Sequence, residues 1–496
     1  MTTPATAAQI EGGAGLRSDA AGPVIGSDKP RSSPTVAMDL VAFADMISVA
    51  MGALLPAYVY SLIGGPATSL AMVVQAGLIA GFITQMWMRN AGMYDLEKIS
   101  DLPNHPLHLL SGIAVGVAAV IGFAMPVIAL HGHITVWFGA WIIASFTLVL
   151  LVRGVARSIL TRMAAAGRFD RSIAVYGAGS ISRRVHDHFA KTRSGIRFVG
   201  VYDDRTGEDR VNAEGLTVSG ELDDLLRDAT AGKIDDIVIA LPQSADSRIA
   251  AIVRRLEQAP SNIHVVTHIA TDLVSTRDRH RVSQIGNVGL IDVKDKPLAD
   301  WAPIVKRAED LLVAAVGLVL ALPILLAAAT AIKLDGSGPV LYRQRRRGLN
   351  GQVFDVLKLR TLTVTDSDDQ VRQVTAGDDR VTRVGRILRR TSIDELPQLW
   401  NVLRGDMSIV GPRPHALIHD EKFSSMLEDY ANRHQVKPGI TGLAQVNGLR
   451  GETRTHDSIR ERVDHDMAYI RAWSLSLDLK IIARTLFVVF TGKNAH

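Results

Sequence analysis

Four long apolar segments fill the first third of this chain, over residues 37–63, 67–88, 107–130 and 134–152. Each is near the roughly 20 residues that a helix needs to cross about 30 Å of hydrocarbon. The pattern predicts a four-helix transmembrane bundle over residues 36–160. Residues 1–35 are rich in Gly, Ala, Ser, Pro and Thr, and this composition predicts a disordered tail rather than a signal peptide.

Basic residues predict how the bundle is oriented. The loops after the first and third segments contain no Lys or Arg, whereas Arg89 and Lys98 follow the second segment and several arginines follow the fourth. Because loops rich in Lys and Arg stay on the cytoplasmic side, both ends of the bundle are expected to be cytoplasmic. Within the first segment, Asp39 is expected at the membrane interface and Asp45 is expected to face the bundle interior.

The pattern changes to alternating strands and helices over residues 170–295. Short runs rich in β-branched residues predict strands at 172–176, 198–202, 236–241 and 263–266. Helical segments separate them, which is typical of a Rossmann-like parallel α/β domain.

A glycine-rich turn follows the first of these strands. Gly177 and Gly179 match a dinucleotide phosphate loop, and Asp203-Asp204 lies where a ribose-binding acid is expected. The third glycine position is Ser182, however. The motif is therefore compatible with a scaffold that carries no chemistry, which we favour, and with a site for a nucleotide or regulatory ligand.

A fifth apolar segment, from about Leu311 to Ile332, is long enough to span a membrane but has positive charge at both ends. Lys306 and Arg307 precede it, and Lys333 and an arginine cluster follow it. Both flanks therefore prefer the cytoplasm. Pro323, near the middle, interrupts helical hydrogen bonding. These features predict a re-entrant helix over residues 306–333 that enters the membrane, bends at Pro323 and returns.

The remainder, residues 340–496, is predicted to be soluble but interfacial, and with the re-entrant helix it makes up a C-terminal domain over residues 300–496. Apolar and basic residues are interleaved from Ala468 to Val489, which favours helices that lie on the membrane surface. An ordinary amphipathic packing helix is the alternative. The triplet Arg345-Arg346-Arg347 is expected to be a solvated patch that faces lipid headgroups.

Two adjacent carboxylates, Asp394 and Glu395, lie between arginine clusters in this domain. Because Pro397 is tolerated in a first helical turn, the pattern predicts a helix that begins near Ser392 to Asp394. A carboxylate there could attack phosphorus or hold Mg²⁺. Ser392-x-x-Glu395 also matches a capping box, in which Glu395 would only bind a backbone N–H group.

Several motifs in order carry a resemblance to a known family. They are Gly338–Gln344, Lys358–Thr361, Thr391–Val402, Gly405–Pro414 and Lys437–Gly442. Together they resemble the bacterial sugar transferase family, the monotopic phosphoglycosyl transferases. The upstream bundle and Rossmann-like domain resemble its large subclass, the polyprenyl glycosylphosphotransferases of exopolysaccharide synthesis.

The resemblance implies transfer of a sugar-1-phosphate from a UDP-sugar to undecaprenyl phosphate, with release of UMP. Glucose is the first expectation and galactose the second. It implies that Asp394 is the nucleophile of a covalent phosphosugar intermediate and that Glu395 binds Mg²⁺. It also implies contacts with phosphate or nucleotide by Lys358, Arg360, Arg389, Arg413, Arg450 and Asp466.

The expected fold is thus a membrane protein of mixed α and α/β class. It has an N-terminal four-helix bundle, a Rossmann-like parallel domain and an α-rich catalytic domain on a re-entrant hairpin. The expected location is the cytoplasmic face of the bacterial inner membrane, among its lipids, with a homodimer as the expected assembly.

Composition narrows the alternatives. The absence of Cys excludes disulfides and thiolate metal sites, and the positive mean hydropathy supports a membrane protein. A pI near 9.4 suits anionic lipids and nucleotides; nucleic acid is not expected as a partner, because the basic residues flank apolar segments. Two other functions stay open, a membrane-anchored Rossmann oxidoreductase and a non-catalytic scaffold of a polysaccharide machine.

Overall fold

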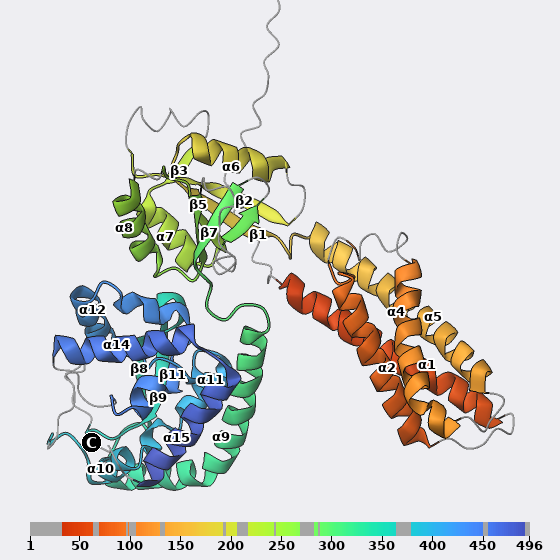
Figure 1. Ribbon diagram of the computed structural model, residues 1–496. Helices are drawn as coiled ribbons and strands as arrows, with labels where there is room; N and C mark the ends of the chain where they lie inside the picture. The colour runs from red at the N-terminus through yellow and green to blue at the C-terminus, as the bar shows by residue number, and fades with distance from the viewer. Residues whose placement is uncertain are drawn as a thin grey trace, which may run out of the picture.

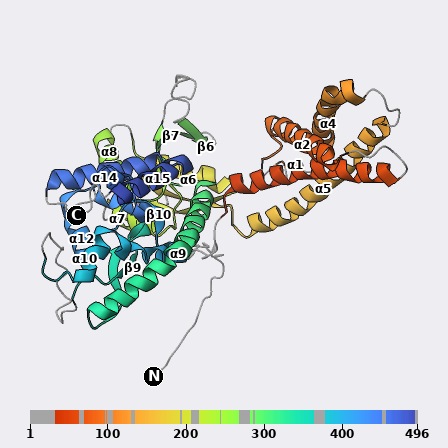
Figure 2. The ribbon, with the colours of Figure 1, turned by 90° about the horizontal axis from the view of Figure 1, so that it is seen from below.

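The computed structural model describes residues 32–62, 69–95, 98, 106–128, 134–191, 195–205, 217–242, 245–267, 282–285, 288–363, 378–449 and 455–491. Figure 1 shows three bodies along the chain: a helical bundle, an α/β domain, and a C-terminal region edged by one long helix. Figure 2 shows the bundle to one side of the other two bodies. The predicted tail at residues 1–35 lies almost wholly outside the described residues.

Four apolar helices form the bundle, as the sequence predicted. They are α1 (Pro34–Leu62), α2 (Leu70–Asn90), α4 (Pro106–Ile128) and α5 (Ile134–Ala165). Among the described residues, α1, α2 and α5 are long and apolar enough to cross a membrane, and the apolar part of α4 with described side chains is Pro106–Gly122. The chain is a membrane protein.

Polar contacts inside the bundle join distant helices. Asp45 on α1 is fully buried and pairs with Arg153 on α5 at 2.8 Å, which confirms that Asp45 faces the interior. The indole Nε1 of Trp141 donates to the carbonyl of Val49 at 2.9 Å. Because an unpaired polar group in hydrocarbon costs several kcal/mol, such mutual satisfaction favours one packing of the helices.

The α/β domain contains a seven-stranded sheet with the order β3-β2-β1-β4-β5-β7-β6. The strands are β1 (Arg171–Tyr176), β2 (Ile196–Tyr202), β3 (Val218–Gly220), β4 (Asp236–Ile239), β5 (Asn262–Thr267), β6 (Val282–Ile285) and β7 (Val288–Lys294). The helices are α6 (Ser180–Lys191), α7 (Leu222–Thr230) and α8 (Asp246–Leu256). The four predicted strands are present and run parallel, whereas β7 and β6 add an antiparallel edge that was not predicted.

The long helix α9 (Ala302–Asp335) opens the C-terminal region and contains Pro323. Figure 1 shows α9 running down one edge of this region and then turning beneath it. Both ends of α9 contact the same body. Near its start, Arg307 donates to the carbonyls of Val402 and Leu403. At its end, Arg360 donates to the carbonyls of Ile332 and Gly336.

The rest of the C-terminal region combines short strands with helices. Strands β8 (Leu341–Arg347) and β9 (Val353–Leu359) form an antiparallel hairpin, and β10 (Ser408–Val410) pairs parallel with β11 (Gly439–Thr441). The α-helices are α10 (Arg383–Arg390), α11 (Gln398–Arg404), α12 (Leu417–Met426), α13 (Leu443–Val446), α14 (His456–Arg471) and α15 (Leu475–Thr491). The 3₁₀ helices are η6 (Leu349–Gly351), η7 (Ile393–Glu395) and η8 (Tyr430–Gln435).

One apolar core joins these elements beneath the candidate site. Val356 of β9, Val402 of α11 and Met407 are fully buried together, with Tyr469 of α14 and Ile481 of α15 packed against them. Apolar side chains on the other face of α15, including Leu479 and Phe487, are exposed. Helix α15 therefore packs on the core with one face, as an amphipathic packing helix does, and its other face is exposed.

Candidate active site

The two adjacent carboxylates lie on the short turn η7. Ser392 before it adopts a left-handed conformation, with φ at 57°, and makes no side-chain capping hydrogen bond. The predicted capping box is therefore not formed by Ser392. The predicted helix start needs correction as well, because only a 3₁₀ turn begins at Ile393, and the α-helix begins at Gln398 after Pro397.

Glu395 is buried and forms ion pairs with two cations. The Nζ of Lys358, on β9, lies 3.0 Å from Oε1 of Glu395. Arg413 binds the same carboxylate with both terminal nitrogens, Nη2 to Oε1 at 2.6 Å and Nη1 to Oε2 at 3.2 Å. A bidentate arginine contact fixes both distance and orientation, so Glu395 joins the hairpin and the loop after β10 to the turn that carries Asp394.

Asp394 is partly buried beside this group. Burial raises the pKa of Asp394, and the neighbouring Glu395 raises it further, whereas Lys358, Arg389 and Arg413 act in the opposite direction. Arg389 lies on the last turn of α10 and is exposed. Three predicted phosphate-binding cations therefore act electrostatically on the predicted nucleophile.

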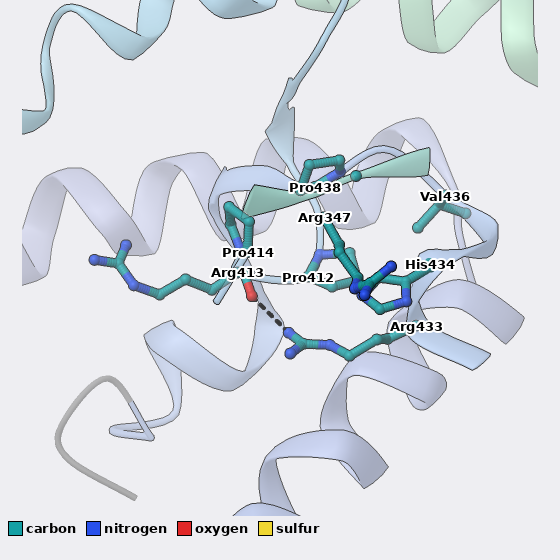
Figure 3. Close-up of a pocket in the computed structure, with 9 residues that line it drawn as sticks. Arg347, Pro412, Arg413, Pro414, Arg433, His434, Val436 and Pro438 are labelled. Carbon is teal, nitrogen blue, oxygen red and sulfur yellow. Dashed lines mark hydrogen bonds between the residues drawn. The ribbon is translucent and has the colours of Figure 1, made fainter. Parts of the chain in front are cut away.

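Arg413 reaches the site from a loop that also borders a small pocket. The pocket is lined by Arg347, Gly348, Pro412, Arg413, Pro414, Arg433, His434, Val436 and Pro438. Figure 3 shows the Arg413 side chain pointing away from the other labelled residues, while its carbonyl oxygen faces Arg433. Glu395 raises the pKa of the Arg413 guanidinium, so this side chain is positively charged.

Three other predicted site residues have different surroundings. Arg360 donates to carbonyls at the end of α9, a structural role that the sequence did not predict. Asp466 is buried on α14 and pairs with Arg433 at 2.7 Å. Arg450 lies outside the described residues. Substrate contacts by these three residues stay predictions.

Sequence reasoning missed two arginines near the site. Arg346 and Arg345 are neighbours on β8, but Arg345 is exposed, whereas Arg346 donates to the carbonyl of Pro414 and interacts electrostatically with Glu395 and Arg413. Burial lowers the pKa of Arg346 to about 10. The expected solvated patch is therefore wrong for Arg346. Alternation along a strand was the available signal. Arg433, on η8, is buried and was not singled out by any motif.

The carboxylate pair fits a magnesium ion only in part. No group of three or more His, Cys, Asp or Glu that could hold a metal occurs among the residues the structure describes. Mg²⁺ commonly takes one or two protein carboxylates and completes its shell with water and substrate phosphates. Asp394 and Glu395 fit that arrangement, although Glu395 already accepts hydrogen bonds from two cations.

Side chains of the α/β domain itself form hydrogen bonds with the backbone of the glycine-rich turn. The backbone N–H of Ala178 donates to Oδ2 of Asp203 at 2.6 Å, and the hydroxyl of Ser182 donates to the carbonyl of Gly177. Asp203 also accepts from Arg205. A carboxylate thus occupies a loop amide that would contact a phosphate in a dinucleotide fold, which favours the scaffold interpretation.

The chain is similar to known proteins over most of its length. Residues 301–492 match the family model described as bacterial sugar transferase. A protein of Komagataeibacter xylinus, named undecaprenyl-phosphate glucose phosphotransferase, is 36% identical over 85% of this chain and 78% of its own length. The chain belongs to the bacterial sugar transferase family. Asp394, Glu395, Lys358 and Arg413 all lie within the part that matches this family's model.

Two further relatives of the sugar transferase carry the name UDP-glucose:undecaprenyl-phosphate glucose-1-phosphate transferase. The protein of Escherichia coli (strain K12) is 39% identical over 66% of this chain and 70% of its own length. That of Klebsiella pneumoniae is 44% identical over 56% of this chain and 59% of its own length.

A second family model, described as a CoA-binding domain, matches residues 68–267.

Proposed function

We propose that this sugar transferase moves glucose-1-phosphate from UDP-glucose to undecaprenyl phosphate, releasing UMP. The names of its relatives support the substrates. The observation that carries the proposal is the charge arrangement around η7. There a partly buried carboxylate, Asp394, lies beside Glu395, which is paired with Lys358 and Arg413. Such a site combines a nucleophile with cations that match phosphoryl oxygens.

The reaction proceeds in two displacements. A carboxylate oxygen of Asp394 attacks the phosphorus that carries glucose, and the bond from that phosphorus to the bridging oxygen of UMP breaks. An oxygen of undecaprenyl phosphate then attacks the same phosphorus, and the bond to Asp394 breaks. Each step exchanges one energy-rich phosphate linkage for another, so the protein mainly positions groups and neutralises charge.

The cations of the site have two roles in this scheme. They oppose the rise in the pKa of Asp394, which favours the ionised form that a nucleophile requires. Arg413, Lys358 and the exposed Arg389 also supply donors for phosphate oxygens. Glu395, with Asp394 beside it, would hold Mg²⁺, which when bound neutralises charge that develops on the phosphoryl oxygens.

The proposed topology places the site on the cytoplasmic face of the inner membrane, with α9 re-entrant. Positive flanks, Pro323 and the contacts of both ends of α9 with one body support it. Trp301, at the start of α9, also donates to Asp39 of α1 at 2.8 Å, which is consistent with both segment starts lying on one side. Exposed apolar residues of α9 such as Val319 and Leu320 suit hydrocarbon.

Single cysteines test this topology, because the chain has no Cys of its own. Ala299→Cys and Ser337→Cys flank α9. In spheroplasts, a membrane-impermeant maleimide is expected to label neither, and after permeabilisation it should label both. Labelling of only one site in intact spheroplasts would show that α9 spans the membrane.

A panel of UDP-sugars tests the proposed activity. Purified protein in nanodiscs with undecaprenyl phosphate is expected to release UMP fastest from UDP-glucose. UMP release from UDP-galactose alone would change the assigned sugar, and no release from any UDP-sugar would refute the function.

Mass measurement in the same nanodiscs decides the predicted homodimer. The scaffold alternative predicts intact polymer production when Asp394 and Glu395 are both alanine.

A further inference from the structure

The loop that presents Arg413 depends on hydrogen-bond donors from elsewhere in the chain. It runs over residues 411–416, between β10 and α12, and prolines flank Arg413 on both sides. Proline has no backbone N–H, so the loop has few donors of its own while its carbonyl groups still need partners when buried. The position of Arg413 is therefore set by whatever binds those carbonyls.

Three successive carbonyls of this loop each accept a hydrogen bond from a different element. The backbone N–H of Gly439, on β11, donates to the carbonyl of Pro412 at 2.9 Å. Nη2 of Arg433, on η8, donates to the carbonyl of Arg413 at 2.7 Å. Nη1 of Arg346, on β8, donates to the carbonyl of Pro414. Two of the three donors are guanidinium groups.

The Arg433 side chain is itself held on several sides. It is 3% exposed. It pairs with Asp466 at 2.7 Å and donates to the hydroxyl of Tyr430 at 3.0 Å. His415, the loop residue after Pro414, lies 2.6 Å from Nη1 of Arg433. A buried guanidinium fixed by a carboxylate, a phenol and an imidazole is a rigid anchor for the backbone carbonyl that it binds.

The Arg346 side chain reaches the same loop from strand β8. Its Nη2 donates to the side chain of Gln344 at 2.8 Å, which orients the guanidinium along β8. Glu395 and Arg413 both act electrostatically on it. Arg346 therefore contacts the loop immediately beyond Arg413 and also interacts electrostatically with Glu395.

We propose that Arg433 and Arg346 are positioning residues, which fix the backbone on the two sides of the Arg413 side chain so that it meets Glu395 and the substrate phosphates. This inference rests on the proposed function, because its effect is exerted through Arg413 on phosphoryl transfer. It also gives Asp466 a role, that of orienting Arg433 from α14.

Kinetics in nanodiscs with UDP-glucose and undecaprenyl phosphate test the proposal. Arg346→Lys keeps the charge but loses the planar fork, and Arg433→Gln combined with Asp466→Asn removes both members of the buried pair. Each variant is expected to lose about 10- to 100-fold in kcat, with KM for UDP-glucose changed less than about 3-fold, because a displaced cation mainly affects the transition state. Arg345→Gln, on the exposed face of the same strand, is the control and is expected to retain wild-type kcat.

A double-mutant cycle separates positioning from simple destabilisation. In an Arg413→Ala background, the same changes are expected to cost less than about 2-fold more, because the group that they position is gone. If the Arg433 variant does not fold, as judged by thermal unfolding, the Arg346→Lys cycle decides alone. Losses that multiply in the Arg413→Ala background would overturn the inference while leaving the proposed function intact. If the wild-type protein itself releases no UMP, both the inference and the proposed function are refuted.

Discussion

The contact between Gly411 and Gly439 gives the sharpest structural prediction for catalysis. A Cβ atom added at Gly439 would lie 2.1 Å from the backbone nitrogen of Gly411 and 2.6 Å from its carbonyl oxygen. Both are backbone atoms, so no side-chain rotation can relieve the overlap. Gly439→Ala must therefore move β11 away from the residue that begins the Arg413 loop.

The size of that movement sets the expected loss. Nonbonded carbon atoms approach other heavy atoms to about 3.5 Å, so the two segments must separate by about 1 Å or more. A displacement of about 1 Å in a catalytic group can cost about 100-fold in rate. We therefore expect Gly439→Ala to lower kcat about 100-fold, with a smaller change in KM, together with about 1–3 kcal/mol of overpacking strain.

UMP release in nanodiscs measures this effect, and Gly336→Ala is the matched control. Gly336 has extended backbone, and a Cβ atom there would meet no atom within 4 Å. The control is expected to retain wild-type kcat. Wild-type kcat in Gly439→Ala would refute the claim that close packing of these two glycines holds the Arg413 loop in place.

Three further predictions concern charged groups. Glu395→Gln leaves Lys358 and Arg413 buried without the carboxylate that they pair with, so activity should be lost and the unfolding free energy should fall by about 3 kcal/mol. Thermal unfolding that is unchanged in this variant would contradict a stabilising role of the two ion pairs. Asp45→Ala leaves Arg153 unpaired in the bundle, and the melting temperature in detergent should fall and recover on adding Arg153→Met. Burial lowers the pKa of Lys294 from 10.5 to about 8. Between pH 8 and 10.5 Lys294 is therefore protonated in the unfolded chain but not in the folded protein, so the unfolding free energy should rise with pH over this range. The rise should be missing in Lys294→Met.

Local patterns predicted much of the fold because they depend on neighbouring residues. Apolar runs of membrane-spanning length and runs of β-branched residues became the bundle helices and the parallel strands. The antiparallel edge formed by β6 and β7 was not predicted. The turn at η7 departed from its local signal too, because Ser392 adopts a left-handed conformation without a side-chain capping hydrogen bond, and Glu395 pairs with Lys358 and Arg413.

The candidate site could be predicted only in part for a similar reason. The motifs named Asp394, Glu395, Lys358 and Arg413, and the structure gathers their charges around one turn. The roles of Arg433, Arg346 and Arg360 rest on hydrogen bonds to carbonyls distant in sequence. Every residue has a backbone carbonyl, so the spacing of residues in the sequence does not reveal which carbonyl an arginine binds.

Transfer of glucose phosphate onto Asp394 is the central claim, and trapping the intermediate tests it most directly. Wild-type protein in nanodiscs, incubated with UDP-glucose radiolabelled in the sugar and without lipid acceptor, is expected to acquire a covalent label. Added undecaprenyl phosphate should then move the label into the lipid fraction. Asp394→Asn should acquire none and release no UMP. Undiminished labelling or UMP release in Asp394→Asn would contradict the account.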